Sequence, residues 1–133
     1  MITLTIPGEP VAKGRPRMTR AGHAYTPAKT RQYEAAVRAL ALSEIGAIAL
    51  EGPLSVHIIC SYRIPPSWTK ARQKRAQDGT EHMITKPDID NACKAVIDAI
   101  NGVFWVDDRQ IVRLTVDKLY SRIPAVTVTV REL

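Results

Sequence analysis

Cysteine is scarce in this sequence, which has 133 residues but only two thiols, at Cys60 and Cys93. They form no CxxC pair, so there is no recognisable zinc or redox motif, and we expect free, buried thiols in a reducing cytoplasm. Aromatic residues are also few, so the core must be mainly aliphatic. No apolar stretch approaches the ~20 residues of a membrane span, and the apolar N-terminal run precedes the bases, the reverse of a signal peptide. We therefore expect no membrane partner.

The length and the balance of residue types predict one globular domain over residues 1–133. Hydrophobic residues make up 45% and charged residues 24%, a composition that excludes a disordered chain. The formal net charge of +6 favours polyanionic partners only mildly. The positions of the charges therefore matter more than their sum.

Acidic residues are missing from two windows of the sequence, 10–33 and 63–77. Each window holds several bases: Lys13, Arg15, Arg17, Arg20, Lys29 and Arg31 in the first, and Arg63, Lys70, Arg72, Lys74 and Arg75 in the second. The sign reverses between residues 88 and 108, where five of the 13 acids lie. A surface that only keeps a protein in solution mixes the two signs, whereas this sequence separates them.

The pattern of apolar residues predicts two main helices, over residues 28–47 and 88–101, and four strands. The strands are expected at 2–6, 54–62, 110–120 and 125–131. Glycine, proline and bases make 11–25 a loop, and the long connection 64–87 has room for a short helix over 69–77. The last two strands alternate apolar and polar residues, which favours an antiparallel hairpin with one solvated face.

Four aspartates lie near the two ends of the predicted 88–101 helix. Asp88 and Asp90 straddle its start, where exposed backbone amides favour negative charge, and Asp107 and Asp108 follow it after a short apolar turn. If the carboxylates meet, an all-oxygen ligand set selects Mg²⁺, with Mn²⁺ as a substitute, over zinc. The helix is about 20 Å long, so the turn must fold back for Asp108 to reach Asp90. Capping, turn chemistry and an ordinary Asp90–Lys94 ion pair explain the same residues without a metal.

A magnesium site on a basic protein points to metal-assisted hydrolysis of a phosphodiester. Lys94 lies one turn after Asp90 on the same helix face, where it can hold the scissile phosphate or neutralise developing charge. The DNA backbone is expected to contact bases of both windows and one base before the aspartates: Lys13, Arg15, Arg17, Arg20, Arg72, Lys74, Arg75 and Lys86. Basic loops that only confer solubility are the alternative.

The block KPDIDNACKAVIDAINGVFWVDD, residues 86–108, resembles the RusA family of Holliday-junction resolvases. Shared features are a D-x-D-N-x-x-K helix start, a helix of small residues, and an apolar turn that ends in Asp-Asp. The opening PVAKGRPRMTRAGHAYTP is similar to the basic N-terminus of the phage and Gram-positive branch. Some members carry an arginine run directly before D-x-D, whereas this chain has Ile-Thr-Lys-Pro over 84–87. The resemblance therefore gives no basis for assigning the cut-site sequence preference of those members to this chain.

The resemblance implies an α/β (α+β) domain with a mixed four-stranded sheet and two main helices, in the order β-α-β-α-β-β. It also implies a homodimer that resolves four-way DNA junctions in recombination and repair by paired symmetric cuts. The cofactor it implies is Mg²⁺, and no nucleotide cofactor is expected.

Carried onto this sequence, the family's metal-binding carboxylates fall on Asp88, Asp90 and Asp108, and its essential lysine falls on Lys94. Asn91 and Asp107 match neighbouring positions. Asn91 is expected to orient a carboxylate or a water, and Asp107 to lie beside the ligands rather than among them.

The resemblance implies further that the turn after the helix returns Asp108 to the metal. Two other functions stay open at this point. One is a nuclease for flap or other branched DNA, and the other is a junction-binding module without catalysis.

Overall fold

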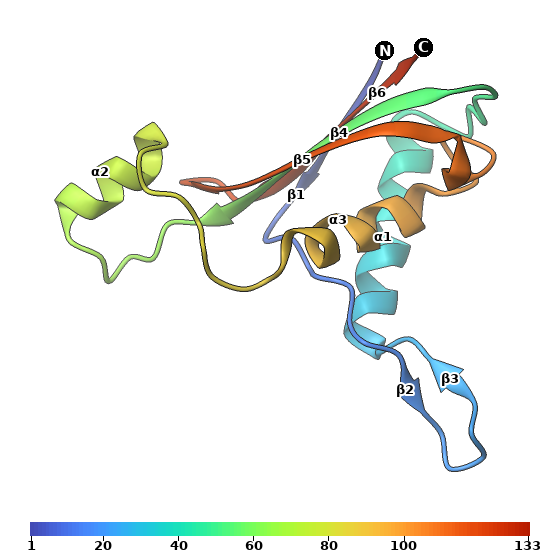
Figure 1. Ribbon diagram of the computed structural model, residues 1–133, viewed down its shortest axis with the longest axis horizontal. Coiled ribbons are helices and arrows are strands. Elements are labelled where there is room, and N and C mark those ends of the chain that lie inside the picture. Colours follow the sequence, from blue (N-terminus) through green and yellow to red (C-terminus); the bar gives the residue numbers. More distant parts are fainter.

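A computed structural model describes residues 1–133 as a mixed four-stranded sheet with two helices packed on one face (Figure 1). The main elements are β1 (Ile2–Pro7), α1 (Ala28–Glu44), β4 (Leu54–Arg63), α2 (Lys70–Asp78), α3 (Ile89–Ile100), β5 (Ile111–Ser121) and β6 (Ala125–Glu132). A 3₁₀ turn, η1 (Asp108–Gln110), leads into β5. The predicted α+β class and order of elements are confirmed, and the short helix predicted between the second strand and the second main helix is present as α2.

The sheet order is β1-β6-β4-β5, with β4 parallel to β5 and antiparallel to β6. The prediction that the last two strands form a hairpin is therefore wrong, because β4 lies between them. Every second residue of β4 from Leu54 to Tyr62 is buried, and such a strand takes a central place in a sheet. Residues 122–124 carry the chain past the end of β4. Alternation of apolar and polar residues shows which face of a strand is buried, but not which strand is its neighbour.

Helix α3 is the most deeply buried helix, and six of its 12 residues lie in the interior: Ala92, Cys93, Ala95, Val96, Ala99 and Ile100. It packs between α1, which buries Val37 and Ala41, and the sheet. Cys60 and Cys93 are free and buried in this core, as predicted, and burial raises the pKa of the Cys60 thiol to about 12. The α1 helix ends at Glu44, three residues before the predicted end, because Gly46 adopts a left-handed backbone with φ of 101°.

The turn after α3 is part of the core. Gly102, with φ of 80°, ends the helix, and Val103, Phe104 and Trp105 that follow are completely buried. The amides of Ala49 and Leu50 donate hydrogen bonds to the carbonyls of Val103 and Phe104 at 3.0 and 2.9 Å. The turn is therefore pinned to the segment that precedes β4.

The opposite face of the sheet carries polar side chains and no helix covers it (Figure 1). Threonines and charged residues alternate there, and His57 Nε2 lies 2.7 Å from Asp117 Oδ2.

None of the helices combines the length and the apolarity that crossing a membrane requires.

We expect Phe104→Ala to lower the free energy of unfolding by about 3–5 kcal/mol, because it empties a fully buried site beside α3. Urea denaturation followed by far-UV circular dichroism measures the change. Val106→Ala is the control, because Val106 is 55% exposed two residues away and its truncation leaves the stability nearly unchanged. A small effect at Phe104 would contradict the buried position of this turn.

Candidate functional site

Two carboxylates stand at the start of α3 without partners in the chain. Asp88 occupies the N-cap position, but its side chain makes no capping hydrogen bond, and Asp90 follows in the first turn. Both residues are exposed. Backbone amides at a helix start stabilise negative charge, so this position suits two aspartates whose oxygens remain available to a ligand.

The turn that delivers Asp88 to this position is held from the sheet. Lys118 of β5 donates hydrogen bonds from Nζ to the carbonyls of Thr85 and Pro87 at 2.6 and 2.9 Å. Sequence reasoning missed Lys118. The sequence did contain a signal, because Lys118 occupies a core-facing position of a strand that otherwise alternates apolar and polar residues. In the sheet it pairs with the buried Cys60.

Lys94 extends from the exposed face of α3, with 60% of its side chain accessible. Its ammonium lies 4.0 Å from Asp98 Oδ2, one turn further along the helix, and no ion pair joins it to Asp90. The ordinary Asp90–Lys94 ion pair considered from the sequence is therefore absent. Lys94 remains largely free to meet an anion at the start of α3.

Lys13 joins the basic N-terminal segment to α3. Its ammonium contacts Glu34 of α1 and lies 3.0 Å from Asp98 Oδ2, and its backbone amide donates to the Asn91 carbonyl at 2.9 Å. Desolvation acts to lower the pKa of Lys13, but the hydrogen bonds to Glu34 and Asp98 outweigh it and raise that pKa overall. The charge of Lys13 is thus already paired, and this residue positions the segment that carries the other bases.

A basic cleft of about 570 Å³ lies beside the start of α3. Its walls come from the N-terminal segment, the start of α1 and the turn before α3, and they include Arg15, Arg17, Lys29, Lys86 and Pro87. No acidic residue lines it. Pro87 directly precedes Asp88, so the cleft opens next to the two carboxylates.

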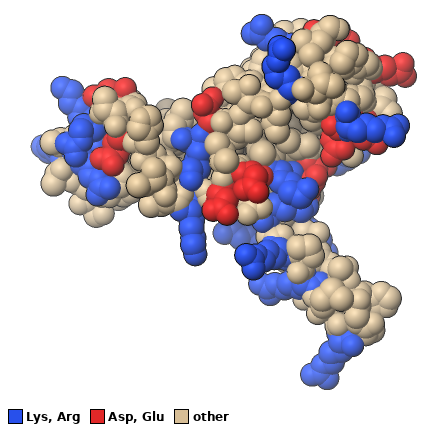
Figure 2. All heavy atoms as spheres, in the orientation of Figure 1, with Lys and Arg blue, Asp and Glu red and all other residues tan.

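The predicted loop over residues 11–25 contains a short hairpin of β2 (Arg17–Met18) and β3 (Ala24–Tyr25) that projects from the body of the protein (Figure 1). Arg20 lies in its exposed turn. Figure 2 shows Lys and Arg side chains over this hairpin and over α2, with acidic side chains between the two groups. The bases of the two sequence windows therefore lie in two separate parts of the molecule.

Gly14 anchors the base of this segment to α1. Its amide donates to Thr30 Oγ1 at 3.0 Å, and a Cβ at this position would lie 2.9 Å from Pro27 Cγ. Only glycine allows the chain to approach α1 this closely.

Asp107 and Asp108 lie at the other end of α3. The helix has 12 residues and is about 18 Å long, so the expectation that the turn returns Asp108 to Asp88 and Asp90 within one chain is wrong. The cause is the buried turn Val103–Trp105, which is bonded to the segment before β4 and cannot fold back along the helix. No three His, Cys, Asp or Glu side chains of the chain come together as a metal-ligand group.

The two aspartates of this second pair differ in their surroundings. Asp107 Oδ1 accepts a hydrogen bond from the Arg109 amide, and the Gln110 side chain accepts one from the Asp107 amide, which forms a capping box. Asp108 makes no side-chain contact of this kind and is exposed. Asp107 is therefore engaged in holding the turn, whereas Asp108 is available.

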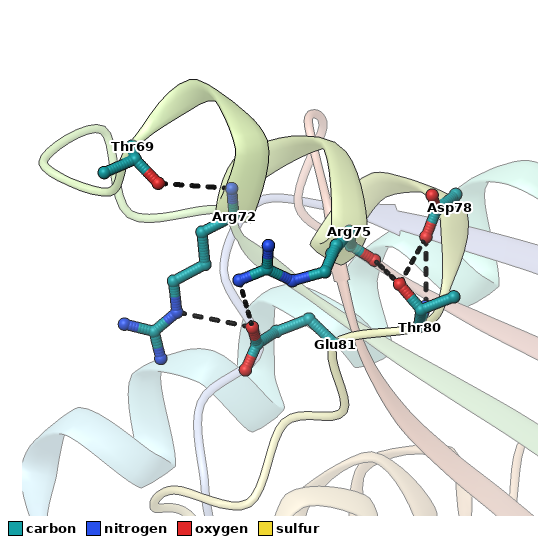
Figure 3. Close-up of polar contacts among 6 residues, drawn as sticks. All are labelled: Thr69, Arg72, Arg75, Asp78, Thr80 and Glu81. Atoms are coloured by element: carbon teal, nitrogen blue, oxygen red, sulfur yellow. Dashed lines mark hydrogen bonds and ion pairs between the residues drawn. The ribbon is translucent and has the colours of Figure 1, made fainter.

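The bases of α2 divide into those that pair with Glu81, which Figure 3 shows, and those that do not. Arg72 and Arg75 both approach Glu81 Oε1, at 3.4 and 3.7 Å, and the Arg72 guanidinium also stacks on Trp68, 3.6 Å from the ring centroid. Lys74 has no such partner. Sequence reasoning treated these three bases alike and missed Glu81, which lies just beyond the acid-free window.

The family of endodeoxyribonuclease RusA matches residues 7–131 of this chain. The uncharacterized protein YqaN of Bacillus subtilis (strain 168) is 38% identical over 137 residues, which cover 99% of this chain and 96% of that protein. The match includes the basic N-terminal segment, α3 and the Asp107–Asp108 pair within one continuous alignment. On this evidence, the chain belongs to the RusA family of endodeoxyribonucleases.

Proposed function

We propose that this protein is a Mg²⁺-dependent endonuclease that resolves four-way DNA junctions in recombination and repair. The observation that carries the proposal is a pair of carboxylates, Asp88 and Asp90, that have no partner within the chain. They lie at the start of a helix, beside a basic cleft that no acidic residue lines. The cleft attracts the phosphodiester backbone, and the carboxylates suit a hard cation. Membership of the RusA family supports the same reaction.

The donor set at the start of α3 fits magnesium but is incomplete in one chain. Asp88 and Asp90 offer only carboxylate oxygens, which Mg²⁺ and Mn²⁺ prefer. Asp108 lies at the far end of the helix. We infer that the third carboxylate is the partner subunit's Asp108, supplied across a two-fold axis that sets the two α3 helices antiparallel. Each dimer then carries two equivalent sites.

Exposed apolar side chains support a dimer contact at the Asp108 end of the molecule. Val106, Val112 and Leu114 are 55%, 65% and 45% exposed there. Val106 precedes β5, and Val112 and Leu114 lie near its start; β5 is an edge strand with an unpaired hydrogen-bonding side. Natural proteins seldom leave an apolar sheet edge open to solvent, so this edge is suited to contact a second copy.

A bound Mg²⁺ would activate water and neutralise charge on the phosphate during hydrolysis. The chain's own groups would position the DNA. Lys94 would hold the scissile phosphate near Asp90, and Asn91, the next residue after Asp90, would orient a carboxylate or a water. Asp107 would keep Asp108 in place through the capping box.

The backbone contacts we propose come from the exposed bases of the first cleft and of α2. Arg15, Arg17 and Lys86 line the cleft, Arg20 extends from the hairpin, and Arg72, Lys74 and Arg75 lie on α2. Lys13 contributes through its hold on Asn91 and Asp98 rather than through direct contact. Binding that depends on such phosphate contacts weakens steeply as salt rises.

A nuclease for flaps or other branched DNA and a non-catalytic junction-binding module are the alternatives. A panel of four-way, three-way, flap and linear substrates, each with and without Mg²⁺, separates them. Preferential paired cuts in the four-way junction support resolution, equal cutting of all branched forms supports the broader nuclease, and binding without cuts supports the module.

Asp90→Asn is expected to reduce junction cleavage by at least about 10³-fold while binding stays equal or becomes tighter, because a metal ligand and a negative charge are both lost. Gel assays of cleavage and binding measure the two effects. Asp117→Asn is the control, because it removes an exposed carboxylate from the open sheet face. Chelation with EDTA should stop the wild-type reaction reversibly, and cleavage that persists in Asp90→Asn would rule out this ligand.

Lys94→Gln is expected to lower the cleavage rate at saturating DNA by about 10²-fold and the affinity by less than about threefold, because its charge acts on the scissile phosphate. Single-turnover kinetics give both quantities. Lys29→Gln is the comparison, since Lys29 lines the cleft from the first turn of α1 and should affect affinity alone. Equal losses of rate and affinity in Lys94→Gln would indicate a docking residue.

Heterodimers of an Asp90→Asn chain and an Asp108→Asn chain test whether the carboxylates come from two subunits. In a shared arrangement one site collects both substitutions and the other is intact, so heterodimers should nick one strand although each homodimer is inactive. Co-expression with two affinity tags isolates the mixed species. If all three carboxylates acted within one chain, every site would carry a defect and no activity would return.

A further inference from the structure

A second basic cleft, of about 660 Å³, shares no lining residue with the first. It is bounded by α2, the end of β4 and the turn between β5 and β6. Four cations line it, and no acid does: Arg63, Lys70, Lys74 and Arg122. Of these, Arg63, Lys70 and Arg122 are absent from the set of DNA-binding residues proposed above.

The four cations of this α2 cleft are exposed, and none of them forms an ion pair within the chain. The arginines of α2 that do have an acidic partner, Arg72 and Arg75, share Glu81 as shown in Figure 3. Unpaired like charges gathered in one concave surface repel one another and raise the local positive potential. An anionic ligand would relieve this repulsion.

The cleft is pre-formed by contacts that fix α2 against the sheet. Trp68 packs edge-on against Tyr120 of β5 at a centroid distance of 5.0 Å, and the Arg72 guanidinium stacks over the Trp68 ring. Gln73 Nε2 donates to the Trp68 carbonyl at 2.8 Å. Thr69 caps the start of α2, and Gly79, with φ of 88°, ends it. The cations therefore extend from a rigid base, which lowers the entropic cost of binding.

The lining of the cleft favours a phosphodiester backbone over a mononucleotide or another small anion. Its cations come from three separate elements, so they suit an extended ligand with repeated charges. Ile64 is its one hydrophobic residue, and no aromatic side chain lines it, so a base would find no stacking surface. Charge without base recognition is typical of contacts that hold a duplex by its phosphates.

We propose that the α2 cleft binds the backbone of a double-stranded DNA arm away from the cut site. This proposal rests on the proposed nuclease function for the choice of DNA as the polyanion. The acidic side chains lie between the α2 group and the hairpin group of bases (Figure 2), so a branched substrate can contact both groups while its branch point faces α3. The α2 cleft therefore sets affinity and leaves the chemical step unchanged.

The test compares two variants that remove the same number of arginines. Arg63→Gln/Arg122→Gln removes two of the four cations that line the α2 cleft. Arg113→Gln/Arg131→Gln removes two exposed arginines from the open sheet face, near Glu132. Fluorescence anisotropy measures binding to a labelled linear duplex and a four-way junction at several salt concentrations, with Mg²⁺ omitted. A second α2 cleft variant, Lys70→Gln/Arg122→Gln, leaves β4 unchanged and guards against a local folding effect of the substitution at Arg63.

Both α2 cleft variants should bind the duplex and the junction about 10-fold more weakly than wild type, whereas the sheet-face variant should lose less than about twofold. The slope of log affinity against log salt should fall by about 1.8 for two lost phosphate contacts. Cleavage of the junction at saturating enzyme should keep its wild-type rate. Equal losses in all variants would show a net-charge effect, and unchanged binding in the α2 cleft variants would show that the cleft is unused; either result overturns the proposal.

Trp68 supplies a local readout, because Trp105 is completely buried and Trp68 lies at the base of α2. Its emission should change when the duplex binds, and this change should disappear in both α2 cleft variants but not in the sheet-face variant. Tight binding of inorganic phosphate that abolishes the change would instead assign a small-anion site and overturn the proposal. Wild-type protein that binds duplex through this cleft but cuts no DNA would refute the nuclease function and leave the cleft's assignment intact.

Discussion

Burial of α3 between α1 and the sheet fixes where each acidic group of the candidate site lies. Half of the helix is interior, and both of its ends are tied to other elements. At the start, Lys118 holds the turn before Asp88. At the end, Arg38 donates to the Asn101 carbonyl at 3.1 Å and the Val103–Trp105 turn is locked in the core. The turn after α3 is therefore not free to carry Asp108 back along the helix, and for this reason we propose that the third carboxylate comes from a second subunit.

Charged side chains that form ion pairs within the chain and those that do not have different roles. Lys13, Glu34 and Asp98 form a partly buried group that fastens the basic segment to α1 and α3, because a charge removed from water is stable only when it has partners. Asp88, Asp90 and Asp108 have no cationic partner within the chain. The bases of the two clefts are also free of acidic partners. Most of the charges that we assign to metal and DNA therefore have no partner within the chain, whereas Arg72 and Arg75 combine an ion pair with Glu81 and a proposed DNA contact.

The sequence alone predicted the main helices and strands and the position of two aspartates at the start of α3, because both follow from local rules. Apolar periodicity marks helices and strands, and Asp88 and Asp90 stand at a helix start that the pattern of Ile89, Cys93 and Val96 defines. The neighbour of β5 and the position of Asp108 depend instead on long-range packing. Both follow from the burial of β4 and of Trp105, and no local pattern in the sequence predicts where these residues are buried. Similarly, no spacing rule connects Glu81 to Arg72, or Arg122 to Lys74.

The separation of acids within one chain and the two-fold symmetry of a four-way junction lead to the same arrangement. A site assembled from two subunits forms only in the dimer, so a lone chain that binds DNA through its basic clefts would be unable to cut it. In the proposed dimer, two such sites related by a two-fold axis would face the two matching strands of the junction. In that dimer, cutting would be coupled to assembly, whereas the bases proposed to hold the DNA arms are complete in each chain. This difference keeps binding and hydrolysis on separate groups of residues, which is why substitutions in the clefts and at α3 should have separable effects.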